Sequence, residues 1–248
     1  MTPPRSPLLA ISCAALAALA LAGCGVKREA VFTPPAEPFA VMLDGPPGPE
    51  HAALYSAVAH GQTRAAGLDV TVAPPSGSTQ PLAALAAGSV AMAIARPSEV
   101  LLARDHGAAL VAVAALTPQG ADGPVLVVRQ RQAEHDGEAL RAFLHALGQG
   151  ASQAHGSPAS AVALLAGANP SLLGKRSAPR QARRRRLAAL TQAVSSATAA
   201  NPGQPYGYQS PAAWSALASS LYARHVLQTD PETLAPPYTN EFLPGQGI

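Results

Sequence analysis

Side chains able to hydrogen-bond a small molecule gather in three short segments, each directly after an apolar run. Asp44 and His51 lie in the first segment, a group of hydroxyl residues lies in the second, and Glu99 lies in the third. The segments are residues 44–51, 74–79 and 96–99, and the hydroxyl residues are Ser76, Ser78 and Thr79. Ligand sites use a few such polar groups to orient a bound molecule. The three segments are therefore the candidate binding residues.

Each candidate also has a structural interpretation that the sequence leaves open. Asp44, which precedes Gly-Pro, could form a turn. His51 could bond to the backbone, and Tyr55, one turn later on the same helical face, could belong to the core. Residues 76–79 could form a loop and cap the following helix. Glu99 could be placed by the favourable field at a helix N-terminus.

No common catalytic or nucleotide-binding motif occurs. The seven histidines show no H-E-x-x-H spacing, and G-x-S-x-G, G-x-G-x-x-G and G-x-x-x-x-G-K-[ST] are all absent. The two cysteines, Cys13 and Cys24, both fall in the first 24 residues, where we expect one to be removed and the other to be modified. We therefore expect a protein that is not an enzyme and has no metal and no cofactor.

Short apolar runs alternate with helical patterns in the first half of the chain. The predicted strands are 39–43, 68–73, 90–95 and 109–116, and the predicted helices are 50–66, 79–87 and 97–106. This order predicts an α/β fold with a parallel sheet covered on both faces. Ligands bind at the carboxyl ends of the strands in such sheets, where all three candidate segments would lie.

The rest of the chain is predicted to be mostly helical. After a strand at 125–128, helical patterns occupy 138–147, 158–165, 180–199 and 211–227. The last helix carries Trp214, Leu217, Leu221 and Tyr222 at helical spacing. We expect Trp214 and Tyr222 to be core residues.

Composition and charge narrow the function classes. With 48% hydrophobic and 12% charged residues, the chain is typical of a folded globular protein and not of a polytopic membrane protein. The net charge is +3, but residues 139–229 contain nine basic residues and no acidic one. Arg183 to Arg186 could form a solvated helix face or contact anionic lipid headgroups. Because no aromatic residues interleave them, we expect no nucleic acid partner.

Residues 1–23 are typical of an export signal, with one early arginine and a 16-residue apolar stretch. Leu21-Ala22-Gly23-Cys24 resembles the bacterial lipobox, which implies cleavage before Cys24 and lipidation of its thiol. An ordinary secretory signal or a short uncleaved anchor is the alternative. Residues 24–38 contain three prolines and predict an extended tether. We expect the protein in the cell envelope, lipid-anchored to the outer face of the cytoplasmic membrane, or in the periplasm.

Several sequence blocks follow one another in a recognisable order. The first is Leu43-Asp44-Gly45-Pro46-Pro47-Gly48-Pro49-Glu50-His51-Ala52-Ala53-Leu54-Tyr55, and later blocks are Gly67-Leu68-Asp69-Val70, residues 81–88, 91–99, 111–116, 205–214 and 239–247. Together they resemble the periplasmic solute-binding proteins of the thiamine-precursor pyrimidine type, which are related to the fungal thiamine-pyrimidine synthases. The likeness covers residues 39–119 and 124–248.

This resemblance implies a periplasmic binding protein type II fold and the binding component of an ABC importer. The implied ligand is a pyrimidine or a similar small heterocycle, and the implied partner is an ABC permease. Asp44, His51 and Tyr55 would face the ligand, with Ser76, Ser78, Thr79 and Glu99 near it. Aromatic faces and polar side chains suit a planar heterocycle.

Where the family has most of its second lobe, this sequence has only four residues between Gln119 and Pro124. We therefore predict a parallel-sheet first lobe at 39–119 and a reduced, mostly helical second part at 124–248. The alternative function is a truncated relative that binds no ligand and acts as an envelope interaction or structural lipoprotein, or a decaying gene product.

Overall fold

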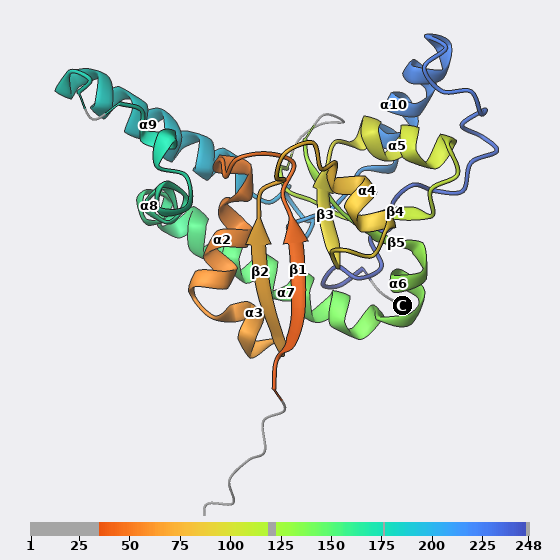
Figure 1. Cartoon of the computed structure of the whole chain (residues 1–248), viewed down its shortest axis with the longest axis horizontal. Helices are drawn as coiled ribbons and strands as arrows, with labels where there is room; N and C mark the ends of the chain where they lie inside the picture. Colours follow the sequence, from red (N-terminus) through yellow and green to blue (C-terminus); the bar gives the residue numbers. More distant parts are fainter. Residues whose placement is uncertain (1–34, 119–122, 176, 247–248) are drawn as a thin grey trace, which may run out of the picture. The chain divides into compact units, whose positions relative to one another are not determined.

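The computed structural model describes residues 35–118, 123–175 and 177–246 (Figure 1). The predicted signal, Cys24 and most of the predicted tether lie outside these residues. Residues 35–248 form one compact unit. Because this unit contains the whole sheet and all three hydrophobic clusters described below, it holds the elements needed to fold without the preceding residues.

A five-stranded sheet is the centre of the unit. Its strands are β1 (Glu37–Met42), β2 (Leu68–Ala73), β3 (Met92–Ala95), β4 (Leu110–Ala115) and β5 (Val125–Arg129), in the spatial order β2-β1-β3-β5-β4. Strand β1 is parallel to β2 and β3, and its Met42 is in register with Ala93 of β3. The carboxyl ends of β1 and β3 therefore lie side by side.

Strand β5 is a correction to the sequence prediction of an all-parallel sheet followed by a separate strand. It lies between β3 and β4 and is antiparallel to both. The connection from Ala115 to Val125 is too short for the crossover of a dozen or more residues that parallel neighbours need, so β4 and β5 pair as a hairpin. Residues after 124 thus complete the sheet of the first part.

Helices cover both faces of the sheet. The bounds of the longer helices are α2 (Ala52–Ala59), α4 (Pro81–Ala86), α5 (Pro97–Asp105), α7 (Gly137–Gly156), α8 (Pro158–Ala168), α9 (Arg180–Ala197) and α10 (Pro211–Ala223). Helices α2 and α7 form one hydrophobic cluster with the sheet, and α4, α5 and α10 form a second cluster on the other face (Figure 1). A third cluster joins α8, α9 and the start of α2. Among the described residues, no helix combines the length and apolar character that a membrane span requires.

The helix predicted over residues 50–66 is divided into three pieces. They are the 3-10 helix η1 (Pro49–His51), α2, and α3 (Gln62–Ala65). The break between α2 and α3 is at Gly61, whose φ of +73° is a left-handed conformation that favours glycine. A second 3-10 helix, η2 (Pro170–Leu173), and helix α6 (Gln130–His135) were not predicted.

Helix α7 extends nine residues past the predicted end at 147, and Gly150 explains how it packs. A Cβ at this position would lie 2.3 Å from the carbonyl oxygen of Ala53 in α2. Glycine therefore allows the backbones of α2 and α7 to approach closely and fixes the helix that follows the first candidate segment.

One of the two core residues predicted for helix α10 is buried. Trp214 is buried and stacks on Tyr238 with ring centroids 5.5 Å apart. The prediction for Tyr222 was wrong, since this residue is 42% exposed. The helix ends one residue after Tyr222, at Ala223, and not at the predicted residue 227.

Candidate ligand site at the carboxyl ends of the strands

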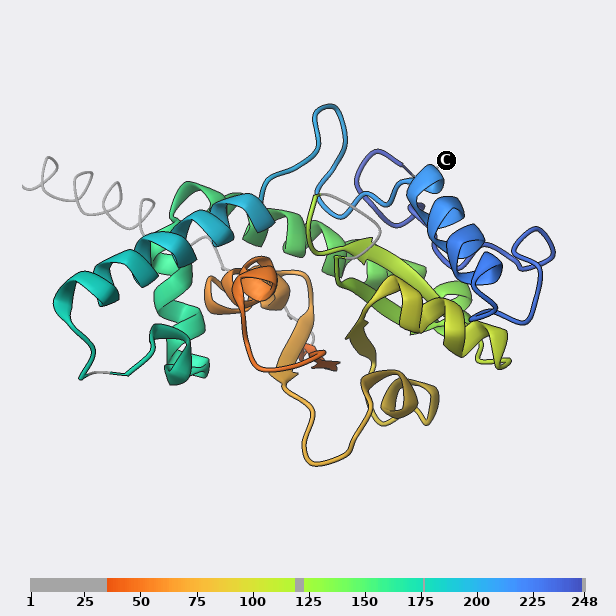
Figure 2. The same ribbon diagram turned by 90° about the horizontal axis from the view of Figure 1, so that it is seen from above.

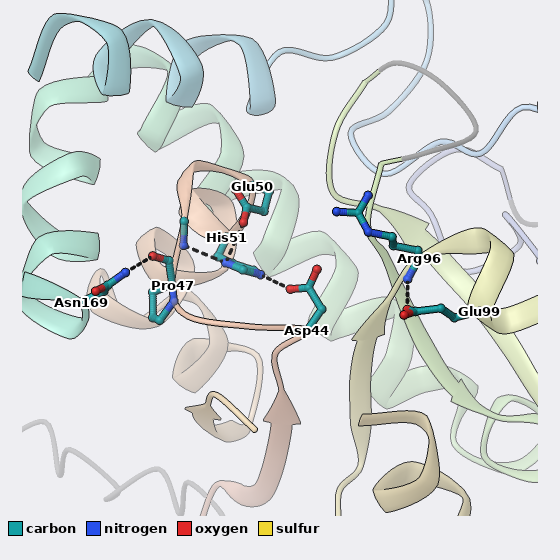
Figure 3. Close-up of polar contacts among 8 residues, drawn as sticks. Asp44, Pro47, Glu50, His51, Arg96, Glu99 and Asn169 are labelled. Carbon is teal, nitrogen blue, oxygen red and sulfur yellow. Dashed lines mark hydrogen bonds and ion pairs between the residues drawn. The ribbon is translucent and has the colours of Figure 1, made fainter. Parts of the chain in front are cut away.

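The loop after β1 folds around a buried histidine (Figure 3). His51 is fully buried, and its Nε2 lies 2.9 Å from Oδ1 of Asp44. The backbone N–H of Gly48 donates to Nδ1 of the same ring at 3.0 Å. Because Nδ1 accepts this bond, Nε2 carries the ring proton and donates it to Asp44. His51 thus holds Asp44 in place with both ring nitrogens engaged inside the loop.

Asp44 is the exposed partner of this pair. Its side chain is 24% exposed and stands just beyond the carboxyl end of β1. The hydrogen bond from His51 lowers the pKa of Asp44 and outweighs the opposing effect of partial burial. The carboxylate is therefore ionised at neutral pH and can accept hydrogen bonds from a ligand.

Arg96 brings the opposite charge to the neighbouring strand end. It follows the last residue of β3 and is exposed, and its positive charge also contributes to the lowered pKa of Asp44. The backbone N–H of Arg96 donates to Oε2 of Glu99 at 2.8 Å, so Glu99 closes the first turn of α5 (Figure 3). Glu99 was predicted from the sequence as a site residue and Arg96 was not, although Arg96 occupies the first position after an apolar strand.

The hydroxyl residues of the second segment lie in the loop between β2 and α4. Ser76, Ser78 and Thr79 are all exposed, and the backbone N–H of Thr79 donates to the carbonyl oxygen of Ser76 at 3.2 Å, which forms a turn. Helix α4 begins after Gln80 without a side-chain cap. Among the described residues, no hydrogen bond joins these hydroxyl groups to Asp44 or His51.

Tyr55 lies on α2, half-buried, and packs against the first and third hydrophobic clusters. Burial raises the pKa of its hydroxyl group. Its position joins two parts of the core.

A proline-lined groove adjoins the first loop. Its walls come from Gly45-Pro46-Pro47, from Pro74-Pro75 after β2, and from Ala168-Asn169-Pro170 after α8. The Nδ2 of Asn169 donates to the carbonyl oxygen of Pro47 at 2.9 Å, which ties the end of α8 to the loop (Figure 3). This role of Asn169 was not predicted from the sequence.

A tighter pocket lies farther along the same edge, beside the ends of β3 and β4. Pro97, Tyr208, Gln209 and Trp214 are among its lining residues. Thr117, Pro118 and Gly123 complete one side. We base the candidate site on Asp44 and Arg96, with the proline-lined groove beginning at Gly45 next to Asp44.

Comparison with known proteins supports the fold. Residues 48–123 match the family model described as NMT1/THI5 like, a segment that includes His51, Tyr55 and Glu99 but not Asp44. Over 101 residues, the chain is 35% identical to the formylaminopyrimidine-binding protein of Halalkalibacterium halodurans. That match covers 41% of this chain and spans 30% of the length of the relative.

Two solved structures align with most of the chain. The alkanesulfonate-binding protein SsuA of Xanthomonas axonopodis pv. citri, bound to MOPS, aligns over 78% of this chain and 96% of its own at 14% identity, with a TM-score of 0.54. A ligand-binding component of an ABC-type import system from Staphylococcus aureus, with zinc bound, aligns over 81% and 97% at 9% identity, with a TM-score of 0.57. This chain has the periplasmic binding protein fold. The α/β fold class predicted from the sequence is confirmed.

Within this periplasmic binding protein fold, the oppositely charged Asp44 and Arg96 stand at the edge where ligands of parallel sheets bind. No group of three or more His, Cys, Asp or Glu side chains that could hold a metal ion occurs in the part of the chain that the structure describes. The chemistry available at the site is hydrogen bonding and stacking on apolar walls.

Proposed function

We propose that this protein is the solute-binding component of an ABC importer and binds a thiamine-precursor pyrimidine or a similar small heterocycle. The observation that carries the proposal is the fixed Asp44 carboxylate, held by buried His51 and placed beside the strand end that bears Arg96. The name of the relative from Halalkalibacterium halodurans supports a pyrimidine ligand. The proposed partner is the permease of the importer.

The proposed binding mode uses each of these groups once. Asp44 accepts a hydrogen bond from an amino group of the ligand, and Arg96 donates to a ring nitrogen or a substituent oxygen. His51 acts as a positioning residue, since its ring nitrogens are already engaged. Glu99 and Tyr55 support the site from α5 and α2.

The expected lipid anchor remains part of the proposal. Lipidation of Cys24 would hold the domain at the outer face of the cytoplasmic membrane through the residues that precede β1. The protein would then act in transport without catalysing a reaction.

A specific observation favours the alternative of a truncated relative without ligand. The described residues contain one sheet of five strands, and the chain matches only 30% of the length of its formylaminopyrimidine-binding relative. Under this alternative, no second lobe faces the strand ends, and a ligand would be less buried.

Titration calorimetry with a series of aminopyrimidines tests the proposal. We expect binding heat for the native protein and a 10- to 100-fold weaker affinity for Asp44→Asn, because a hydrogen bond to a charged group contributes about 1.5 to 3 kcal/mol. Asp69→Asn is the matched control. Asp69 lies on β2, and its exposed carboxylate forms an ion pair with Arg64 of α3. Absence of both heat and a thermal shift with native protein would favour the truncated relative.

A further inference from the structure

The first half of helix α9 carries a dense positive charge that the proposed transport function does not use. Five of its first seven residues are arginines: Arg180, Arg183, Arg184, Arg185 and Arg186. All five are exposed, whereas the two buried residues of the helix, Val194 and Ala197, lie in its second half. The arginine-bearing end lies on the outer side of α8 (Figure 2).

Exposed leucines accompany these arginines. Leu173, at the end of η2, is 42% exposed, and Leu187 is 45% exposed. Together with Arg180, Arg183 and Arg184 they line one open groove. We call these five residues the α9 basic face. It combines cationic side chains with apolar ones at a single surface.

This arrangement opposes the stability of the isolated helix. Positive charges near a helix N-terminus are unfavourable because the aligned peptide dipoles already make that end positive. Arg180 also faces Arg183 and Arg184 at the i+3 and i+4 positions, where like charges repel. No Asp or Glu occurs between residues 139 and 229 to compensate. An anionic partner would reduce the repulsion between these arginines.

We propose that the α9 basic face docks on an anionic phospholipid surface. The arginines would bind lipid phosphates, and Leu173 and Leu187 would enter the boundary between headgroups and acyl chains, as in interfacial amphipathic helices. The two exposed leucines favour a membrane as the partner. A nucleic acid is disfavoured because the face carries no aromatic side chain on which bases could stack. The contact is separate from the proposed ligand site.

Vesicle cosedimentation of residues 35–248 tests this surface without the lipid anchor. Vesicles of phosphatidylcholine alone are compared with vesicles that also contain phosphatidylglycerol, at low and high salt. We expect binding only to the anionic vesicles and weaker binding at high salt. Arg183→Gln with Arg184→Gln should weaken partitioning about 30-fold, since each basic residue near an anionic surface contributes about 1 kcal/mol.

The matched control removes two exposed arginines elsewhere. Arg131→Gln with Arg224→Gln lowers the net charge equally and should leave partitioning nearly unchanged. An equal loss in this control would show that total charge, and not the α9 basic face, drives binding and would overturn the proposal. Failure of the native protein to bind anionic vesicles would overturn it too.

Two further experiments distinguish binding to lipid from binding to other anions. Leu187→Gln should weaken vesicle binding several-fold while leaving retention on soluble polyphosphate unchanged. Binding to polyphosphate without binding to vesicles would assign the face to soluble polyanions and refute the membrane contact. Circular dichroism and a cooperative melt for each variant verify that the loss is not unfolding.

Discussion

The loop after β1 and the first half of α9 use charge in opposite ways. In the loop, the Asp44 carboxylate is ionised, partly buried and hydrogen-bonded to His51, whose second ring nitrogen accepts a backbone hydrogen bond and lies 3.6 Å from Oε1 of Glu50. In α9, five arginines are exposed in the first seven residues. Positive charges repel one another there, and the helix N-terminus is an unfavourable place for them. The loop is built to place one charge accurately, and the helix to present many charges together. A binding site for one small molecule needs the first design, and a docking surface tolerates the second.

The largest expected effect comes from breaking the loop. His51→Ala removes a fully buried ring and leaves the N–H of Gly48 and the Oδ1 of Asp44 without their hydrogen-bond partner. Loss of this packing and of these bonds should lower the free energy of unfolding by about 2 to 4 kcal/mol. Urea denaturation followed by the fluorescence of Trp214 measures it. A change below 0.5 kcal/mol, about the size of an ordinary surface substitution, would show that the loop is not organised by His51.

A smaller effect concerns the acid stability of the same loop. The pKa of Asp44 in the folded protein lies below its ordinary value of 3.8, so its ionised form stabilises the fold above that value and this contribution is lost as pH falls through the lowered folded pKa. We expect native protein to be more stable than Asp44→Asn at neutral pH and the difference to shrink below the ordinary pKa. Thermal melts across this range measure it. A difference that grows on acidification would contradict the assignment.

The smallest effect has the opposite sign and concerns α9. Arg183→Gln with Arg184→Gln should raise the free energy of unfolding by about 0.5 kcal/mol, because it removes repulsion near a helix N-terminus. The same denaturation experiment measures it, with Arg131→Gln and Arg224→Gln as the control. Destabilisation by the α9 variant would show that these arginines hold the fold together and would remove the contrast with the loop.

Sequence periodicity was sufficient to predict most strands and helices and the edge of the sheet where the site lies. Apolar alternation and glycine or proline at element ends are local signals, and they predicted β2 and the start of α5 well. The shortness of the link between residues 115 and 125 was also visible, and it could have predicted the hairpin that places β5 between β3 and β4.

Other features depend on contacts that no local pattern encodes. The bond from Asn169 to the carbonyl oxygen of Pro47 joins residues 122 positions apart. The closure of the first loop around His51 depends on which face of α2 packs on α7, and that packing depends on the absence of a side chain at Gly150. The proposed roles of Asp44, His51, Tyr55, Glu99 and the hydroxyl residues stay predictions until a ligand is tested.

The β4–β5 hairpin bears on how the protein could signal that it is loaded. A bilobal receptor reports occupancy by rotating one lobe toward the other about the strands that connect them. Here the chain turns back into its own sheet at this point, and β5 is paired with β3 on one side and with β4 on the other. Under the proposed function, we expect a ligand to rearrange only the strand-tip loops, so small-angle scattering should show the same radius of gyration with and without solute.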